Sequence, residues 1–471
     1  MIYPDNFEQK TGFDKIRELI TDKCLSTLGM ERVSKMVFLN KYDEVIKLLH
    51  QTQEFVAVLN GKNEFPANYF FDVRPALKRI RIEGTYIDEV ELFDLRRSLD
   101  TIRNIVNFFK TDEDDEKPLY PYLSELSGNI SVFPHLISRI DQMIDKFGRM
   151  KDNASSELSR IRRELSSTLS GISRSLNNIL KTAQTEGIVD KDVTPTMRDG
   201  RLVIPVMPAF KRKIRGIVHD ESASGKTVFI EPAEVVEANN KIRELENEER
   251  REIIRILTSF SDELRPLSED IFYSYEFLAD IDFIRAKALF ALQVNALLPV
   301  VENCRQIDWY HAVHPLLYLS LQKQHKQVVP LDIMLTEKNR ILLISGPNAG
   351  GKSVCLKTVG LLQYMLQCGL LIPVYENSRC GIFDNIFIDI GDEQSIENDL
   401  STYSSHLTNM KYFVKNSNES TILLIDEFGG GTEPQIGGAI AEALLDRFNR
   451  KHTYGVITTH YQNLKHFAED T

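Results

Sequence analysis

The residues best suited to chemistry lie in one short stretch, where an apolar run is followed by glycines, a lysine and a serine. Residues 341–345 read as a strand, Gly346-x-x-x-x-Gly351-Lys352-Ser353 is the P-loop pattern, and residues 354–367 read as a helix. Glycines let backbone N–H groups cradle phosphate oxygens, and the helix N-terminus adds its positive dipole end. We expect Lys352 to reach the β- and γ-phosphates of ATP and Ser353 to bind Mg²⁺. The predicted nucleotide-binding residues are Gly346, Pro347, Asn348, Ala349, Gly350, Gly351, Lys352, Ser353 and Val354.

Two further predicted strands end in residues that suit the same chemistry. The apolar run 421–425 leads into Asp426 and Glu427, which is the Walker B arrangement. We expect Asp426 to join the Mg²⁺ shell and Glu427 to activate or orient water. A glycine-rich loop follows at residues 429–434, and the run 455–459 leads into His460. His460 would sense or hold the γ-phosphate at the carboxyl edge of the sheet, where ligands of α/β proteins bind; the alternative is an ordinary strand-end histidine. The predicted catalytic residues are therefore Glu427, His460 and Lys352.

A polar segment between these motifs, residues 389–406, ends in a cluster of hydroxyl side chains that begins a helix. Its members are Ser401, Thr402, Ser404 and Ser405. Such a helix start offers hydroxyls and free N–H groups to an anion. The P-loop already supplies one phosphate cradle, so this second one could serve the γ-phosphate of another subunit. The alternative is a plain helix cap.

The elements that must position these residues are mostly helical. Residues 1–150 carry apolar residues at helical spacing, residues 266–304 return to that pattern, and residues 305–471 hold the strands and motifs described above. Between them, residues 151–265 contain two long helical patterns. The first repeats every seven residues and is interrupted at Arg162, which is typical of a coiled-coil seam. We expect an antiparallel coiled-coil arm; the alternative is two ordinary bundle helices.

The insert between the two long helices, about residues 194–232, reads as short strands, including runs at 201–206, 214–220 and 227–230. Between residues 198 and 226 it carries seven basic and three acidic residues, in a chain of net charge −11. A basic tip on an arm suits contact with a phosphate backbone; the alternative is a solvated charged loop. The predicted nucleic-acid contacts are Arg198, Arg201, Lys211, Arg212, Lys213, Arg215 and Lys226.

Composition narrows the classes of protein further. The net charge of −11 argues against a generally basic protein that coats nucleic acid, so any such contact must be local. No apolar run approaches 18 residues and no signal peptide is visible, which predicts no membrane association. The five cysteines are scattered, which favours the reducing cytoplasm and disfavours a zinc or disulfide framework.

The order of the motifs resembles the ABC-type ATPase of the MutS family. The P-loop, the Ser401–Ser405 cluster, Asp426–Glu427, the loop 429–434 and Thr459–His460 fall where that family has its Walker A, signature, Walker B, D-loop and switch histidine. Residues 216–232 and 389–397 look most similar to its MutS-two branch. The resemblance covers essentially the whole chain.

The resemblance implies a multidomain fold: a mostly α-helical lever and core with an inserted coiled-coil clamp arm, followed by an α/β P-loop ATPase domain. It implies a homodimer with two composite sites for ATP and Mg²⁺. In each site Lys352, Ser353, Asp426 and Glu427 come from one subunit and the Ser401–Ser405 cluster from the other. A mismatch-reading domain has no counterpart here, so mismatch recognition is not expected. The nuclease-linked Smr domain is not found either, and nuclease activity is not assigned; the ATPase sheet is expected to lack its last strands.

Two substrates fit this resemblance, and the sequence hardly separates them. One is a stalled or collided ribosome, bound through rRNA, and the other is branched DNA, bound to suppress homologous recombination. Both present phosphate backbones to a basic tip. The remaining alternatives are a mismatch-repair-like DNA-binding ATPase and a structural clamp without turnover, against which Glu427 argues.

Overall fold

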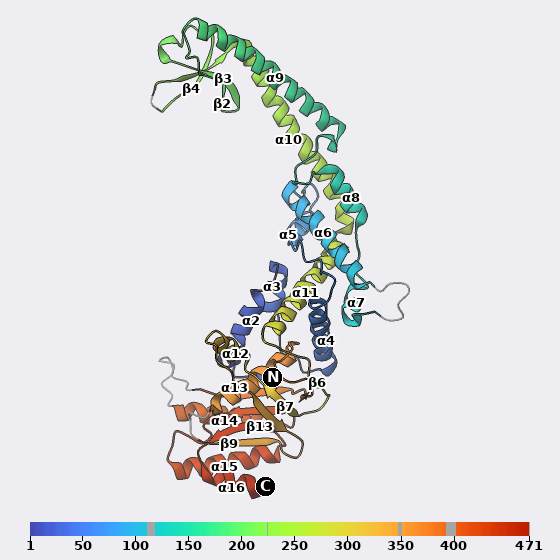
Figure 1. Ribbon diagram of the computed structural model, residues 1–471, viewed down its shortest axis with the longest axis vertical. Helices are drawn as coiled ribbons and strands as arrows, with labels where there is room; N and C mark the ends of the chain where they lie inside the picture. Colours follow the sequence, from blue (N-terminus) through green and yellow to red (C-terminus); the bar gives the residue numbers. More distant parts are fainter. Residues whose placement is uncertain (111–117, 224, 347–350, 392–401, 471) are drawn as a thin grey trace. The chain divides into compact units, whose positions relative to one another are not determined.

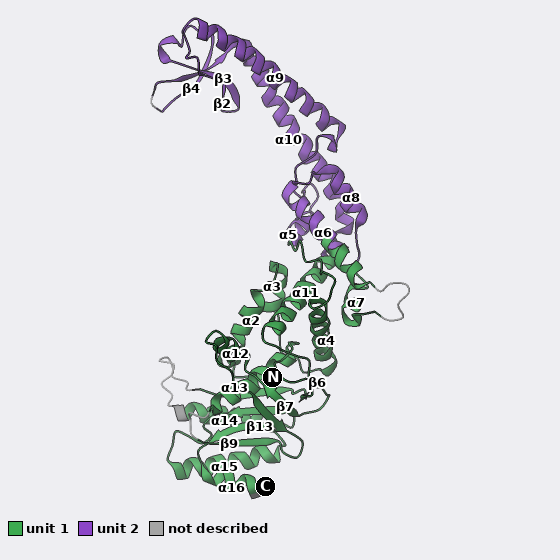
Figure 2. Ribbon diagram, in the orientation of Figure 1, with its two compact units in different colours: residues 1–72, 101–130, 273–471 green, residues 73–100, 131–272 purple. Residues whose placement is uncertain are grey.

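The computed structural model describes residues 1–110, 118–223, 225–346, 351–391 and 402–470 (Figure 1). The chain divides into two compact units, each treated by itself below (Figure 2). Unit 1 comprises residues 1–72, 101–130 and 273–471, and unit 2 comprises residues 73–100 and 131–272. No helix among the described residues is long and apolar enough to cross a bilayer. The domain borders expected at residues 150, 265 and 304 stay predictions, and the two units divide the chain at other positions.

The main sheet of unit 1 has five strands in the order β1-β11-β12-β13-β9, and every neighbouring pair is parallel. All residues of β12 and β13 are buried, as expected for near-continuous apolar runs in a parallel sheet. The strands are β1 (Ile2–Tyr3), β9 (Ile341–Ser345), β11 (Asn385–Asp389), β12 (Thr421–Ile425) and β13 (Tyr454–Thr459). The strands predicted around the P-loop, the two carboxylates and the histidine are therefore confirmed.

Helices connect these strands in the order typical of α/β folds. α13 (Lys352–Gln367) follows β9, and α15 (Pro434–Arg450) joins β12 to β13. α14 (Thr402–Asn416) lies between β11 and β12 in the chain and packs on β11 and α15. α13 packs on β11, β12 and β13, and a Cβ at its Gly360 would lie only 2.8 Å from the Leu424 side chain. This close approach explains a glycine in the middle of the helix.

The short strand β1 was not predicted, since residues 1–150 read as helical. Ile2 pairs with Ile386 and Tyr3 with Phe387, so the start of the chain forms one edge of the main sheet. The Tyr3 ring also stacks on Tyr412 of α14, with ring centroids 3.8 Å apart. A strand of two residues has no periodicity, and its pairing partner lies more than 380 positions away, so no local pattern announces it.

A second sheet and several helices complete unit 1. The sheet has the order β6-β10-β7-β8, and Trp309 of β7 is fully buried and donates from Nε1 to Cys380 Sγ at 2.9 Å. The first helices pack onto the P-loop helix, because the rings of Phe7 and Phe13 lie 4.9 and 4.6 Å from that of Tyr364. The remaining elements are α1 (Phe7–Thr11), α2 (Phe13–Thr21), α3 (Thr27–Ser34), α4 (Tyr42–Leu59), α7 (Pro121–Ser127), β6 (Val300–Val301), β7 (Ile307–Ala312), α12 (Pro315–Gln322), β8 (Leu331–Leu335), β10 (Arg379–Cys380) and α16 (Gln462–Asp470).

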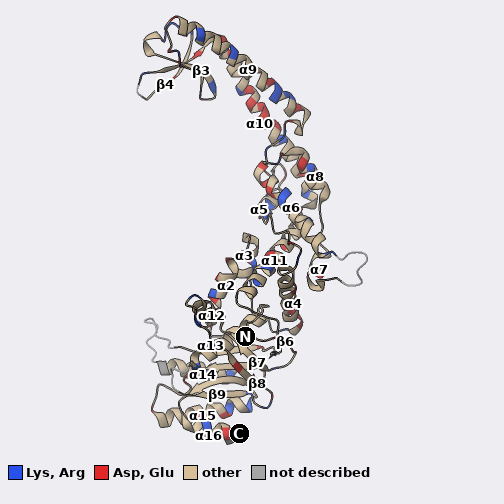
Figure 3. Ribbon diagram, in the orientation of Figure 1, with Lys and Arg blue, Asp and Glu red and all other residues tan. Residues whose placement is uncertain are grey.

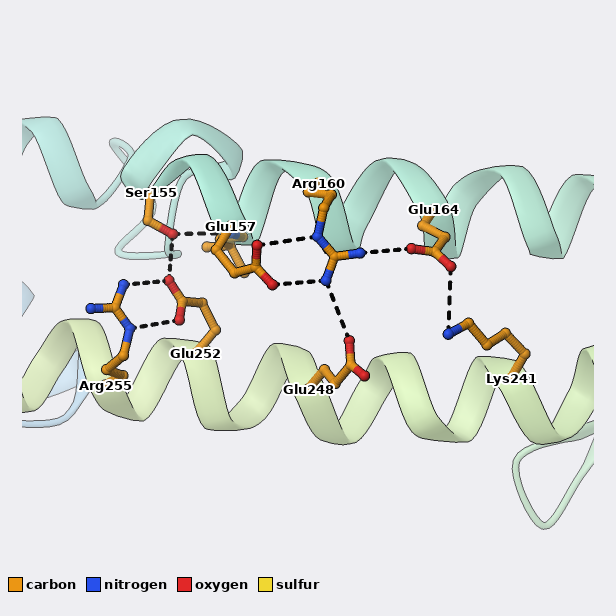
Figure 4. Close-up of polar contacts among 9 residues, drawn as sticks. Ser155, Glu157, Arg160, Glu164, Lys241, Glu248, Glu252 and Arg255 are labelled. Atoms are coloured by element: carbon orange, nitrogen blue, oxygen red, sulfur yellow. Dashed lines mark hydrogen bonds and ion pairs between the residues drawn. The ribbon is translucent and has the colours of Figure 1, made fainter.

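Unit 2 is built around two long helices, α9 (Ser156–Thr185) and α10 (Val236–Leu264), which pack along each other. Polar contacts join them: Ser155 Oγ donates to Glu252 at 2.6 Å, and Lys241 lies 3.5 Å from Glu164 (Figure 4). As residue numbers increase along α9, the numbers of their partners in α10 decrease, so the two helices run antiparallel. Charges of both signs occur along them (Figure 3). The other helices here are α5 (Arg74–Arg79) and α8 (Pro134–Met143), while α6 (Glu89–Phe109) and α11 (Ser268–Gln293) contribute residues to both units.

The interruption of the heptad pattern at Arg162 has a structural reason. Its guanidinium lies 2.6 Å from Glu249 of α10 and 2.6 Å from Asp152, and it also donates to the carbonyl of Met150 at 2.8 Å. The side chain is 24% exposed, so these partners are needed to compensate its partial burial. The charged residue therefore links α10 to the segment that precedes α9.

The insert between α9 and α10 folds as an antiparallel sheet in the order β2-β3-β5-β4. β5 is entirely buried, and residues of β3 and β5 share an apolar core with Ile172, Leu176 and Leu180 of α9. The three expected strands are present, and β2 is an addition. Their bounds are β2 (Thr196–Arg198), β3 (Arg201–Val206), β4 (Gly216–Glu221) and β5 (Val228–Pro232).

Candidate functional site

The parallel main sheet brings the predicted site residues to one edge. β9, β12 and β13 all point the same way, and Ser345 at the end of β9 pairs with Thr459 at the end of β13. The residues that follow these three strands are Gly346, Asp426 and His460. The start of the P-loop, the first Walker B carboxylate and the histidine thus leave adjacent strands at the carboxyl edge, where ligands of α/β sheets bind.

Lys352 is the centre of this arrangement. It is the first residue of α13 and only 6% exposed, and the preceding Gly351 has φ +80°, a conformation that favours glycine. Lys352 Nζ donates to the carbonyl of Gly346 at 2.5 Å and lies 3.4 Å from His460 Nε2. The lysine side chain therefore points back towards Gly346 and the histidine, while Ser353 and Val354 of the same turn are exposed.

Asp426 is held in place by a threonine that sequence reasoning did not select. The carboxylate is 8% exposed, and its Oδ1 accepts from the Thr458 hydroxyl at 2.5 Å and from the Glu427 N–H at 3.2 Å. Among the described residues, none donates a hydrogen bond to Asp426 Oδ2. One oxygen is thus fixed by the protein and the other remains for a ligand, which suits the hard oxygen shell of Mg²⁺. The signal in the sequence was only a hydroxyl residue two positions before His460.

Glu427 has an unusual backbone for a residue other than glycine, with φ +48°. Its N–H donates to Thr458 Oγ1 at 2.9 Å, so the same threonine fixes both carboxylate residues. The side chain is exposed and lines a small hollow together with His406, Gly429 and Gly437. Such left-handed conformations are strained, and they occur where surrounding contacts impose them, often at functional sites.

The loop after Glu427 is fixed by tight packing. Gly429 has φ +82°, and a Cβ there would lie 2.8 Å from the ring of Tyr461. The Tyr461 hydroxyl donates to the Gly429 carbonyl at 2.9 Å, and a Cβ at Gly437 would lie 2.6 Å from that hydroxyl oxygen. These glycines let the residue that follows His460 pack against the loop and join it to the start of α15.

The predicted signature cluster is only partly within the described residues. Ser404 and Ser405 lie in the first turn of α14 and are half-buried, and Thr402 is the first residue of the helix. Ser401 and the P-loop residues Pro347, Asn348, Ala349 and Gly350 lie outside the described residues. Their predicted roles stay predictions.

Two titratable side chains beside the P-loop helix are held uncharged. Burial raises the pKa of the Cys355 thiol to about 11, so the helix N-terminus does not make it a thiolate at neutral pH. Burial and the charge of Lys357 lower the pKa of His314 to about 4. His314 Nδ1 accepts from the Leu317 N–H at 3.4 Å and so caps α12. Neither side chain competes with the residues described above for acid–base chemistry.

The insert between α9 and α10, with its sheet β2-β3-β5-β4, is called the tip sheet below. Its predicted basic contact residues divide into an exposed set and one internal arginine. Arg201 is 15% exposed, and its guanidinium lies 2.7 Å from the fully buried Glu231. His219 and Asn239 also hydrogen-bond to Glu231, at 2.5 and 2.8 Å. Burial acts to raise the pKa of Glu231, but these three partners outweigh it and lower that pKa. The exposed set is Arg198, Lys211, Arg212, Lys213, Arg215 and Lys226.

Arg201 was predicted as a contact to nucleic acid from the excess of basic residues between positions 198 and 226. Its internal partner, Glu231, lies outside that stretch. A cation that neutralises a buried carboxylate is not available to a phosphate without leaving that charge unpaired. Arg198 differs, since its guanidinium rests 4.2 Å above the Phe229 ring and the side chain is still exposed. We therefore remove Arg201 from the candidate contacts and keep the other six.

A parallel sheet whose strands lead into a P-loop lysine, an Asp–Glu pair and a histidine defines the core of a P-loop nucleoside triphosphatase. The family model described as MutS domain V matches residues 342–471, which run from β9 through α16. The chain belongs to the MutS family, and its relatives carry the name of the MutS2 branch.

Those relatives are similar along almost the entire chain. The protein named Endonuclease MutS2 of Alkaliphilus oremlandii (strain OhILAs) is 38% identical over 459 residues, which cover 98% of this chain and 57% of the relative. The proteins of the same name from Geobacillus sp. (strain WCH70) and Finegoldia magna are 38% and 39% identical, over 97% of this chain and 57% of each relative. The chain thus spans somewhat more than half the length of the curated relatives it matches.

Proposed function

We propose that this chain is the ATP-hydrolysing part of a homodimeric clamp of the MutS-two type, which closes on nucleic acid or a nucleoprotein particle in the cytoplasm. The observation that carries the proposal is the convergence of Lys352 and His460, 3.4 Å apart, at the sheet edge where Asp426 also emerges. A lysine, a histidine and a buried carboxylate at that edge suit a nucleoside triphosphate with its metal ion better than any other ligand class.

The residues of this edge would share the work as follows. The Lys352 ammonium would exchange its contact with the Gly346 carbonyl for the β- and γ-phosphate oxygens. Ser353 and Asp426 would hold Mg²⁺, which supplies positive charge against the charge that develops on the transferring phosphoryl group. Thr458 keeps Asp426 in one rotamer by fixing Oδ1, so the carboxylate needs no reorganisation when the metal binds.

Glu427 would orient the attacking water, since its exposed carboxylate follows directly on Asp426. His460 would hold the γ-phosphate from the side of β13. The hydroxyls of Ser404 and Ser405, with Ser401 and Thr402, would complete the site of the partner subunit in trans. ATP would therefore join two heads, and hydrolysis would release them.

The proposed contact to nucleic acid rests on the tip sheet of unit 2. Its six exposed cations lie within residues 198–226 of a protein whose net charge is −11. Such contacts neutralise phosphates without reading bases, so the substrate would be recognised by shape. The two candidate substrates are stalled or collided ribosomes and branched DNA. None of the motifs in residues 1–471 points to phosphodiester cleavage, so we propose no nuclease activity for them.

The test uses Glu427→Gln, which should bind ATP but stall hydrolysis and so favour the closed dimer. This variant is offered four-way DNA junctions and stalled ribosomes together, with ATP, and the captured particle is identified. Capture of ribosomes would make the protein a translation-rescue ATPase, and capture of junctions would support recombination control. The same protein with ADP is the control. Capture of neither particle, or normal hydrolysis by Glu427→Gln, would reject the clamp or the role of Glu427, respectively.

A further inference from the structure

We infer that Asp389 and His406 act as positioning residues, which couple the Walker B strand of one subunit to the serines that it offers to its partner. The inference rests on the proposed function and goes beyond it. Each subunit would contribute the P-loop and Walker B residues to one ATP site and the signature serines to the other. The inference names the contacts that would connect these two groups of residues within one subunit. Neither residue was selected for such a role from the sequence.

Asp389 is the last residue of β11 and is 3% exposed. Its carboxylate binds two side chains of α14: Oδ2 lies 2.6 Å from His406 Nδ1, and Oδ1 accepts from Asn409 Nδ2 at 2.9 Å. Its backbone carbonyl accepts from the N–H of Asp426 at 2.8 Å. A single residue therefore holds both the proposed Mg²⁺ carboxylate residue and the helix that begins with the signature serines.

The attachment to α14 is specific in position. His406 and Asn409 are three residues apart, so they lie on one face of the helix; His406 follows Ser405 directly, and Asn409 lies one turn further on. A buried carboxylate must keep its hydrogen-bond donors, because an unpaired charge in this environment is strongly unfavourable. A displacement at the end of β11 would therefore carry the first turns of α14 with it.

A second contact region connects the same helix to Glu427. His406 and Glu427 both line the small hollow that Leu407, Met410, Phe428 and Gly437 help to enclose. Glu427 and α14 therefore face each other across this small hollow. The proposed water-orienting carboxylate and the helix that begins with the proposed trans signature thus line one hollow within the subunit.

The start of the chain supports this cluster from the other side. The Tyr3 hydroxyl donates to Asn409 Oδ1 at 2.8 Å, which orients the amide so that Nδ2 faces Asp389. The Tyr3 ring stacks on Tyr412, one turn further along α14. β1 thereby fixes the face of α14 that carries His406 and Asn409. These contacts span more than 400 positions of sequence, so they form only in the folded unit.

The consequence is a separation between binding and turnover. ATP bound to a subunit touches its own Lys352 and Asp426, so its affinity does not require the hydrogen bond between His406 and Asp389. Completion of the partner's site does require it, because Ser404 and Ser405 must keep their orientation. Removal of this hydrogen bond should therefore lower kcat and weaken ATP-driven association while it leaves the affinity for ATP nearly unchanged.

The experiment compares His406→Ala, His406→Asn and, as a control, Lys411→Ala at an exposed position of the same helix. The amide nitrogen of asparagine can stand where His406 Nδ1 stands, so it can restore the donor to Asp389. We expect His406→Ala to lower kcat at least tenfold and to abolish ATP-driven dimerisation, with the Kd for a fluorescent ATP analogue changed less than threefold. His406→Asn should recover most of the kcat, and Lys411→Ala should match the parent.

An unchanged kcat in His406→Ala would overturn the inference, and so would an equal decrease in His406→Asn, since that would mean that only the packing of the imidazole matters. Circular dichroism and thermal unfolding identify a variant that has not folded. In that case Asp389→Asn, which removes the charge and keeps the shape, is measured with the same expectations. If the parent protein itself lacks ATP turnover, it is the proposed function that fails, before any variant is compared.

Discussion

The Lys352 ammonium lies 3.4 Å from His460 Nε2, although 108 positions separate the two residues in the chain. One comes from the first turn of α13 and the other follows β13, so the contact exists only because β13 and β9 are neighbours. Two nitrogens at this distance can contact the same oxyanion from two sides. This pair, more than either residue alone, marks the place of the γ-phosphate in the proposed site.

The first prediction concerns that pair. Lys352→Met should lower kcat/KM for ATP about 100-fold or more, as the removal of a preorganised charge from a phosphoryl-transfer site does. Lys352→Ala should abolish turnover in the same way. Steady-state phosphate release measures both, with Lys465→Met at an exposed position of α16 as the control. Unchanged turnover in either Lys352 variant would exclude the P-loop assignment.

The second prediction concerns Thr458, which donates to Asp426 and accepts from the Glu427 N–H. Thr458→Val keeps the shape and removes the hydroxyl, so Asp426 Oδ1 loses its shorter hydrogen bond and the Glu427 N–H keeps only its 3.2 Å contact with that oxygen. We expect a higher Mg²⁺ concentration for half-maximal turnover and about a tenfold lower kcat, in line with the ~1.5–3 kcal/mol of a hydrogen bond to a charged group. Thr458→Ser should behave as the parent. Titrations with Mg²⁺ check this, and identical curves for valine and threonine would contradict it.

The third prediction concerns the tip sheet. Reversal of charge at Lys211, Arg212 and Lys213 should weaken binding to DNA or rRNA and flatten its salt dependence, by about one unit of logarithmic slope for each phosphate that the protein no longer neutralises. Binding curves at several salt concentrations measure both quantities. The control reverses two charges, Lys146 and Arg149, which are exposed in the same unit but lie outside the tip sheet, so effects are compared per reversed charge. Equal effects of the two variants would leave the tip as a solvated charged surface.

The fourth prediction concerns Lys287, which lies near the C-terminal end of α13 and should make the stability of the fold depend on pH. The side chain is 1% exposed, and its ammonium donates to the Gly369 carbonyl at 3.2 Å, just beyond the end of α13. It also lies 4.8 Å from the Phe283 ring centroid. Burial lowers the pKa of Lys287 from 10.5 to about 8, with the charge of Asp280 acting against that shift. The charged form is thus destabilised in the folded protein.

The sign of the effect follows from proton counts. Between pH 8 and 10.5 the unfolded chain retains the proton on Lys287 and the folded protein releases it, so the free energy of unfolding rises with pH in that window. Below pH 8 Lys287 is charged in the folded protein, and burial of this charge lowers the free energy of unfolding by at most about 3 kcal/mol. Lys287→Met should therefore be more stable than the parent at pH 7, and its advantage should shrink as the pH rises to 9.5. Thermal unfolding of both proteins checks this, and a pH-independent difference would contradict it.

Much of the proposed ATP site was predictable because each of its residues carries a local signal. The P-loop glycines precede Lys352, and apolar runs long enough for buried strands end at Asp426 and His460. Strand and helix alternate along this part of the chain, which requires parallel strands and therefore a shared carboxyl edge. The helix after the P-loop and the strands that lead into the P-loop, Asp426 and His460 were predicted correctly, whereas β11 and α15 were not predicted.

Other features depended on pairings between distant segments. Thr458 is a hydroxyl inside an apolar run, and only the neighbouring β12 shows that it serves Asp426 and Glu427. In unit 2, the sequence alone indicated that Arg201 is a surface cation. The pairing of β3 with β5 places Glu231 beside it. In both cases the side chain's partner lies on another strand, beyond the reach of spacing and composition.

The sequence by itself determined the chemistry available to this protein, because residue type and local periodicity establish which groups follow a strand, begin a helix or crowd a loop. The tertiary structure decided which of these groups meet. The pairing of β1 with β11 brings Tyr3 to α14, and the packing of α14 brings His406 to Asp389. Such contacts arise from the burial of apolar faces against one another, which places polar side chains from hundreds of residues apart within hydrogen-bonding distance.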